Sequence, residues 1–403
     1  MRITGIISEF NPFHLGHTVP MAAARGAMDG GEAVVCIMSG NCVQRGDLAI
    51  FRKLARAEAA VRCGADLVVE LPVPYVLGSA ERFAAGGVAL LAAMGLPDTI
   101  LAFGCETADA AVLTAVACAL DTPKVQANIR SGMKAGLSYG AACRAALDAE
   151  GNAGTPLKTP NNLLGIEYLR AIRRLGVDIT PLPVRRQGAA HDSAAPSGKY
   201  ASATYIRGLL QSVQPHDDPW CYMPREAAEL FRREFAQGRG PAGLGQLEAA
   251  VLSLLRLREP PAGGYLDDSE GLSTRIKNIA GGVSSLSELL ERAKTKRYHL
   301  SRLRRLILVM CLGLTPAHRP QTPPYIRVLA ANERGQALLR RMTKTASLPI
   351  LSRTGEVKKL GEGAIQIVTK ESAVTDLMAL CAAGPARRGG SEWRMTPRIL
   401  YKD

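Results

Sequence analysis

Two histidines lie three residues apart near the start of this sequence, in the segment GIISEFNPFHLGH (residues 5–17). An apolar run leads into an Asn-Pro pair, which predicts that a strand ends near residue 8 and a helix begins near Leu15. His14 and His17 would then share one face of the first helical turn, with Gly16 leaving space beside them. The two side chains could pack in the core, bind a metal, or hold an anion together with the amides of the helix N-terminus. Because no third metal ligand follows at short range, the pattern favours an anion such as a phosphate.

A second set of polar residues lies far along the chain, in the segment ASATYIR (residues 201–207). Ser202 and Thr204 stand where a helix is predicted to begin, and hydroxyl side chains are common N-caps there. With Arg207 in the first turn, the same residues could instead surround a triphosphate. The segment is a weak signal alone, but paired with His14 and His17 on one parallel sheet it indicates a nucleotide site.

The elements that must position these residues follow from the hydrophobic pattern. Short runs that are apolar throughout alternate with amphipathic segments, which predicts parallel strands covered on both faces. The predicted strands are 3–8, 33–38, 66–70, 99–103 and 177–184, and the predicted helices are 15–28, 52–63, 80–94, 108–120, 137–149, 163–175 and one from about 203. Ligands of such sheets bind beyond the carboxyl ends of the strands, where we find residues 9–17, 39–46, 104–107 and 185–191.

The chain changes character near residue 212. Residues 215–219 (PHDDP) resemble a linker, and helical patterns without a convincing strand follow at 225–236, 244–257, 286–294 and 300–314. Residues 1–210 hold 20 Lys and Arg against 17 Asp and Glu, whereas the remainder holds 30 against 19, within a net charge of +14. We therefore expect an α/β, Rossmann-like parallel-sheet domain over residues 1–212 and a mostly α-helical basic region over residues 213–403 that binds a polyanion.

One segment of the basic region, KTKRYHLSRLRR (residues 294–305), carries six lysines and arginines around one tyrosine and one histidine. Such residues neutralise nucleic-acid phosphates, and Tyr298 or His299 could stack on an unpaired base. The alternative is a solvated basic helix face. The tail from about Gly384 is expected to be loosely ordered.

The remaining composition narrows the class of protein. Nine cysteines are scattered without a Cys-x-x-Cys pair, so we expect reduced thiols rather than disulfides or a structural zinc site. The longest apolar stretch, residues 83–96, is too short to span a bilayer, and an acidic residue comes too early for a signal peptide. A cytoplasmic protein that contacts no membrane is expected.

Several long segments together resemble one family. GIISEFNPFHLGH, MSGNCVQRGD (38–47), DLVVELP (66–72), TPNNLLGIEYL (159–169) and KTKRYHLSRLRR are similar to the tRNA(Met) cytidine acetate ligases, nucleotidyltransferase-fold enzymes with a His-x-Gly-His motif. The resemblance runs, with gaps, to about Pro349. It implies that ATP adenylates acetate, and that the acetyl group passes to the exocyclic amine of the wobble cytidine in elongator tRNA(Met). Phe10 stands where the family usually has a tyrosine, and Cys42 stands where an aromatic residue is common.

The resemblance also implies roles for particular residues. His14 and His17 would stabilise the transition state, and ATP is expected to be accompanied by Mg²⁺. The residues expected to bind ATP are Ile6, Ile7, Ser8, Glu9, Phe10, Asn11, Pro12, Phe13, His14, Leu15, Gly16, His17, Thr18, Val19, Gly104, Asn161, Asn162, Arg185, Arg186, Ser202, Thr204 and Arg207. Of the two adjacent asparagines we favour Asn161, and of the two adjacent arginines we favour Arg186. One of the asparagines is expected to be only an N-cap. Residues 39–41 and 44–47 could shape the acetate or cytidine pocket. The expected tRNA contacts are Lys294, Lys296, Arg297 and Arg302.

Two other functions compete with this reading. A small-molecule adenylyltransferase of the same superfamily would keep the nucleotide on its product, but such enzymes usually lack a large basic extension. A non-catalytic RNA-binding protein would not need an intact pair of ATP motifs. A class I aminoacyl-tRNA synthetase fits less well, because no Lys-Met-Ser-Lys-Ser-like loop follows.

Overall fold

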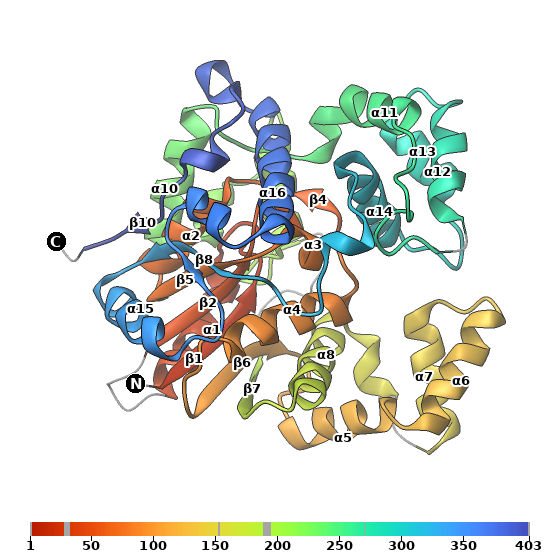
Figure 1. The fold of residues 1–403 in the computed structure, drawn as a ribbon, viewed down its shortest axis with the longest axis horizontal. Helices are drawn as coiled ribbons and strands as arrows, with labels where there is room; N and C mark the ends of the chain where they lie inside the picture. The colour runs from red at the N-terminus through yellow and green to blue at the C-terminus, as the bar shows by residue number, and fades with distance from the viewer. Residues whose placement is uncertain (1, 28–32, 152–153, 188–194, 270, 402–403) are drawn as a thin grey trace.

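A mixed, mainly parallel sheet forms the centre of the computed structural model, which describes residues 2–27, 33–151, 154–187, 195–269 and 271–401 (Figure 1). The strand order is β10-β8-β5-β2-β1-β6-β7, and β9 pairs with β8. The strands from the first half of the chain are β1 (Ile3–Ser8), β2 (Ala33–Ser39), β5 (Leu67–Leu71), β6 (Thr99–Cys105) and β7 (Ile179–Arg185). These five are mutually parallel, as their continuous apolar character predicts.

Alternate residues of each strand enter two different cores. Along β2, Val35 and Ile37 pack with one cluster, whereas Cys36 and Met38 pack with another. The first core lies under α4 (Ala80–Ala92), α5 (Ala110–Leu120), α8 (Pro160–Leu175) and α15 (Glu333–Thr345). The second lies under α1 (Leu15–Gly26), α2 (Lys53–Arg62), α9 (Ala203–Gln211) and α10 (Arg225–Ala236). Both faces of the sheet are therefore covered, which leaves its strand ends as the place for a ligand.

The second half of the chain returns to the sheet, contrary to the expectation that it holds no strand. β8 (Ile326–Ala331) runs antiparallel to β5, and β9 (Ile350–Leu351) and β10 (Arg398–Ile399) pair with β8. All six residues of β8 are buried. The three strands are short and stand among long helices, including α16 (Glu362–Leu380), so their periodicity is weak in the sequence.

A group of helices stands beside the sheet (Figure 1). It comprises α11 (Glu248–Leu257), α12 (Leu272–Ala280), α13 (Leu286–Ala293) and α14 (Leu300–Leu312), which pack on one another through their leucines. A separate helical hairpin is formed by α6 (Pro123–Lys134) and α7 (Tyr139–Ala149). Helix α6 was not predicted from the sequence. Two short elements complete the first half, the β3–β4 hairpin (Cys42–Val43, Asp47–Leu48) and α3 (Val73–Val76).

The predicted polar loop between β7 and α9 is described only in part. Residues 188–194, which include His191, and residue 28 at the predicted end of the first helix lie outside the described residues. The described part of the tail contains a fully buried residue, Glu392, so the expectation of loose order from Gly384 onward is wrong there.

Candidate active site

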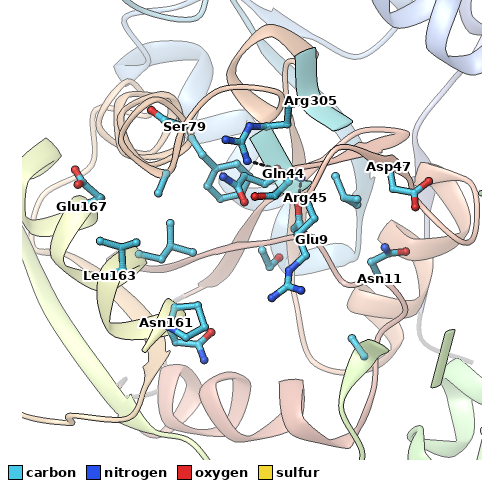
Figure 2. Close-up of a pocket in the computed structure, with 18 of the residues that line it drawn as sticks. Glu9, Asn11, Gln44, Arg45, Asp47, Ser79, Asn161, Leu163, Glu167 and Arg305 are labelled. Carbon is cyan, nitrogen blue, oxygen red and sulfur yellow. Dashed lines mark hydrogen bonds between the residues drawn. The ribbon is translucent and has the colours of Figure 1, made fainter. Parts of the chain in front are cut away.

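A cavity of about 1300 Å³ opens beyond the carboxyl ends of β1, β6 and β7. It is lined by the end of β1, the first turn of α1, the β3–β4 hairpin, and residues of α4, α8 and α9. The first residues of α14 line it as well. Figure 2 shows polar side chains from several of these elements around the cavity. Its location is the one that the parallel sheet predicts for a ligand.

His14 and His17 lie at the N-terminus of α1 with their ring centroids 4.0 Å apart. The Gly16 N–H donates to Nδ1 of His14 at 3.0 Å, and the His14 N–H donates to Nδ1 of His17 at 3.2 Å. Because a ring nitrogen that accepts a hydrogen bond carries no proton, each neutral ring carries its hydrogen on Nε2. Burial lowers the pKa of His17 well below its usual value, and His14 and Arg186 lower it further. His17 is therefore a neutral group that can donate an N–H to an anion.

Gly16 serves the histidine pair in a way that the sequence analysis did not foresee. A Cβ atom at this position would lie 2.7 Å from Cε1 of His14. The glycine thus allows the imidazole to fold back over the first turn of α1 and cap it. Gly16 also lines the cavity, which is consistent with the expectation that it leaves space beside the histidines.

The segment between β1 and α1 is held from both sides. Phe10 adopts a φ of 45°, and its ring and that of Phe13 lie 5.0 and 5.4 Å from the His17 ring. The Asn11 Oδ1 accepts the Ile50 N–H at 2.7 Å, and Arg207 Nη1 donates to the Asn11 carbonyl at 2.8 Å. A φ in this region costs a non-glycine residue free energy, so these contacts compensate for strain next to the histidines.

The cavity contains most of the residues predicted over 6–19. Those that line it are Ile6, Ile7, Ser8, Glu9, Phe10, Asn11, His14, Gly16, His17 and Val19, whereas Pro12, Phe13, Leu15 and Thr18 do not. Phe13 is fully buried against His17, and the Thr18 hydroxyl donates to the Leu15 carbonyl. These four residues shape the motif from behind rather than facing the cavity.

The second predicted motif divides in the same way. Ser202 is the buried N-cap of α9 and accepts the Tyr205 N–H at 3.0 Å. Thr204 and Arg207 line the cavity, and Arg207 Nη2 donates to Oγ1 of Thr204 at 3.1 Å. Ser202 therefore has the ordinary capping role, while the helix that it caps brings Thr204 and Arg207 to the cavity.

The ends of β6 and β7 bring Gly104 beside the arginine pair. Cys105 pairs with Arg185 in the sheet, and the Arg186 N–H donates to the Cys105 carbonyl at 3.0 Å. Arg185 is exposed and Arg186 is half-buried, although both line the cavity. A Cβ atom at Gly104 would meet Cγ of Arg186 at 3.4 Å. Since Arg186 also lowers the pKa of His17, its charge acts on the histidine site, which supports the choice of Arg186 over Arg185.

The structure separates the two adjacent asparagines. Asn162 is buried, and its Oδ1 accepts the N–H groups of Glu106 and Thr107 at 3.0 and 2.9 Å, which fixes the loop after β6. Asn161 lines the cavity and donates to Oε1 of Glu106 at 2.6 Å. Neither is an N-cap, because α8 begins at Pro160, a residue that suits the first helical position.

The loop after β2 also divides into two parts. The Ser39 carbonyl accepts from the buried Arg56, and the Asn41 Oδ1 accepts the Lys53 N–H at 2.8 Å. Neither residue lines the cavity, so the expectation that residues 39–41 shape a substrate pocket is not supported by their placement. Gln44, Arg45 and Asp47, the other candidates of this loop, do line it.

Gln44 connects the end of β1 to α14. Its N–H donates to Oε1 of Glu9, and its carbonyl accepts from Arg305 Nη1 at 3.1 Å (Figure 2). Next to it, Gly46 has a φ of 78°, and a Cβ there would lie 2.3 Å from the Arg305 backbone nitrogen. The β3–β4 hairpin and α14 are therefore in close backbone contact, and together they form one wall of the cavity.

The basic segment before and within α14 reaches the same cavity. Lys294, Arg297 and Arg302 line it, whereas Lys296 does not. The Arg302 guanidinium lies 5.0 Å from the Tyr298 ring centroid, so this ring is covered on one side. Arg305 and Tyr139 also line the cavity but were not predicted. The i,i+3 spacing of Arg302 and Arg305 could have indicated Arg305, whereas the sequence held no signal for Tyr139.

Two further searches concern only the part of the chain that the structure describes. No group of three or more His, Cys, Asp or Glu side chains there is arranged to hold a metal ion. No helix there is both long and apolar enough to cross a membrane.

Comparisons with known proteins agree with this geometry. The family described as HIGH Nucleotidyl Transferase matches residues 1–389. A tRNA(Met) cytidine acetate ligase of Acetivibrio thermocellus is 34% identical over 417 residues, covering 99% of this chain and 100% of that protein. The counterpart from Syntrophomonas wolfei is 33% identical and covers 98% and 99% of the two chains.

Solved structures of Thermotoga maritima TmcAL give the same result. The apo form superposes with a TM-score of 0.91 at 29% identity, and the form bound to alpha-thio ATP with a TM-score of 0.88. Both comparisons cover 100% of each chain. The chain belongs to the HIGH nucleotidyl transferase family and, within it, to the tRNA(Met) cytidine acetate ligases.

Proposed function

We propose that this chain is an ATP-dependent ligase that adenylates acetate and transfers the acetyl group to the exocyclic amine of the wobble cytidine of elongator tRNA(Met), giving N4-acetylcytidine. The observation that carries the proposal is one cavity lined both by the histidine pair at the β1 end and by the basic residues before α14. The relatives that share its whole length are named for this activity. A cytoplasmic location belongs to the same proposal, because its substrate is tRNA.

In the first half-reaction, an acetate oxygen attacks the α-phosphorus of ATP and pyrophosphate leaves. The Nε2–H groups of His14 and His17 donate to phosphate oxygens, and Arg186 and Arg207 add positive charge. Binding of alpha-thio ATP by the Thermotoga relative supports a nucleotide in this cavity. Mg²⁺ would be held mainly by the triphosphate oxygens, since the described residues offer no cluster of metal ligands.

In the second half-reaction, the cytidine amine attacks the acetyl carbon and AMP leaves. Lys294, Lys296, Arg297 and Arg302 would hold the tRNA backbone near the cavity. Within this proposal, residues 1–212 carry the chemistry and the region from 213 carries tRNA binding. Because β8, β9 and β10 belong to the central sheet, we assign tRNA binding within this region to the helices α11–α14.

Incubation with labelled acetate, ATP and tRNA tests the proposal. Label on tRNA supports the ligase. Label only in acetyl-adenylate would support the first half-reaction and contradict tRNA as the acetyl acceptor. Adenylate retained on a small product would favour the adenylyltransferase, and no use of ATP would favour an RNA-binding protein.

His17→Ala sharpens the test. Loss of one preorganised donor should slow acetate-dependent ATP–pyrophosphate exchange by about 10²- to 10³-fold while tRNA binding persists. Normal exchange in this variant would contradict the assignment of the histidine site.

A further inference from the structure

We propose that Glu9 is the general base of acetyl transfer, accepting the proton that the cytidine amine loses. The inference rests on the proposed function and assigns one step of it. Glu9 follows β1 directly, lines the cavity and stands between the histidine motif and the β3–β4 hairpin. The acyl adenylate and the tRNA must meet in this part of the cavity, since the phosphate site lies on one side of it and α14 on the other.

The histidines are unsuited to this step. Nδ1 of each ring already accepts a backbone N–H, and Nε2 carries the hydrogen. Protonation at Nδ1 would break the hydrogen bonds that cap α1, and burial holds the pKa of His17 low. The carboxylates of the cavity are therefore the side chains better suited to accept the proton.

The other carboxylates that line the cavity are engaged elsewhere. Glu81 pairs with Arg174, Glu167 with Arg170, and Asp267 with Arg319, while Asp268 accepts from Ser273 and Asp47 from the N–H groups of Leu48 and Leu244. Figure 2 shows Glu167 and Asp47 on opposite sides of Glu9 and away from it. Within the described part of the chain Glu9 forms no ion pair, and its Oε1 accepts only the Gln44 N–H.

The surroundings of Glu9 suit a base. The titratable and charged groups that face it are Arg56 of α2, Arg207 of α9, Arg45 and Cys42 of the hairpin, and Tyr168 of α8. Burial raises the pKa of Glu9, while the Gln44 N–H and the three arginines lower it. The carboxylate is thus more basic than an exposed one, as a general base requires, while the three arginines favour its ionised form.

The step balances in atoms and charge. The N4 nitrogen forms a bond to the acetyl carbon, and the bond from that carbon to the phosphate oxygen breaks with its electron pair leaving on AMP. The N4 proton passes to Oε2 of Glu9, which later releases it to water.

Glu9→Gln tests the inference because the amide oxygen still accepts the Gln44 N–H. We expect single-turnover transfer from preformed acetyl-adenylate to tRNA to slow by about 10²- to 10⁴-fold, a much larger loss than that of ATP–pyrophosphate exchange. The wild-type transfer rate should fall as pH falls, and this acid limb should be absent in the variant. Glu81→Gln, a matched change in a cavity carboxylate paired with Arg174, should leave transfer near wild type.

The outcomes are separable from those of the proposed function. If wild type neither exchanges nor transfers, the proposed function is wrong and the inference falls with it. If wild type is active and Glu9→Gln transfers normally, or loses exchange as much as transfer, the inference alone is overturned. Glu9→Asp covers a folding defect: it should retain partial transfer with the acid limb at lower pH, and an unmoved limb would contradict the assignment.

Discussion

Buried cations in one region of this molecule and half-buried cations in another are balanced differently by nearby acidic groups. Behind the loop after β2, Lys53 lies 2.7 Å from Glu70 and 2.5 Å from Glu392, and Arg327 lies 2.9 Å from Glu70. None of these side chains is more than 4% exposed. Burial acts to lower the pKa of Arg327, but Glu70 and Glu392 outweigh it and raise the pKa. The network ties α2 and β5 to β8 and the C-terminal tail.

Two cations of the cavity wall, Arg186 and Arg305, are placed differently. Within the described residues, Arg186 and Arg305 form no ion pair, and Arg305 donates only to the Gln44 carbonyl. Burial lowers the pKa of both, that of Arg305 to about 10. A protein that hides positive charge without a counter-ion gives up stability. The ion-paired charges of the network hold elements of the fold together, whereas Arg186 and Arg305 are in the places where the proposed function puts an anionic ligand.

Removing the centre of the network should have the largest effect. Lys53→Met leaves Glu70 and Glu392 buried with less compensating charge, so the free energy of unfolding should fall by about 3–5 kcal/mol. Urea unfolding measures it. Arg225→Ala, which breaks the exposed pair with Glu229, should change stability little. Equal losses in the two variants would contradict the structural role of the network.

Removing a cation of the cavity wall should weaken ligand binding rather than lower the stability of the fold. Arg186→Met removes a half-buried charge that forms no ion pair among the described residues, so stability should be unchanged or slightly higher. ATP should bind about 10- to 100-fold more weakly, because a hydrogen bond to a charged group contributes about 1.5–3 kcal/mol. Isothermal titration with ATP measures this, and Arg185→Met should lose less. If Arg186→Met unfolds more easily but binds ATP normally, Arg186 would stabilise the fold and not the bound nucleotide.

The sequence predicted the cavity region better than the network. Continuous apolar strands and the pairing of His14 and His17 with Arg207 were sufficient to predict that these three residues lie together beyond the strand ends, because each motif is local. Lys53 and Glu392 lie 339 residues apart, and no local pattern joins them. The sequence favoured Asn161 over Asn162, but the N-cap role expected of one of them was wrong, because α8 begins one residue earlier, at Pro160.

A third prediction concerns the pH dependence of the network. Burial and the nearby Glu70 raise the pKa of Glu371 to about 8 from a usual value of 4.5. The fold is stabilised by the protonated carboxyl, fully below about pH 4.5, and this contribution is lost as pH rises through about 8. Glu371→Gln cannot ionise, so across that window it should gain stability over wild type by up to about 1.4 kcal/mol per pH unit.

Urea unfolding of both proteins from pH 5 to pH 9 checks this difference. The pKa of Glu392, which Lys53 and Arg327 lower to about 2 despite burial, predicts the opposite loss of stability on acidification in both proteins. Parallel stability curves for wild type and Glu371→Gln would show that the carboxyl is ionised in the fold.

The smallest effect is expected where single basic residues meet tRNA. Arg297→Ala removes one cation that lines the cavity, so tRNA affinity should fall modestly, and the slope of log affinity against log salt should decrease by about 1. Arg341→Ala makes the same charge change at an exposed site on α15, which does not line the cavity. Filter binding at several salt concentrations separates the two. If both variants change the slope equally, tRNA responds to net charge, and position at the cavity contributes nothing. A change in Arg297→Ala alone would show that cations lining the cavity act on tRNA by their placement, whereas those of the buried network act on the fold.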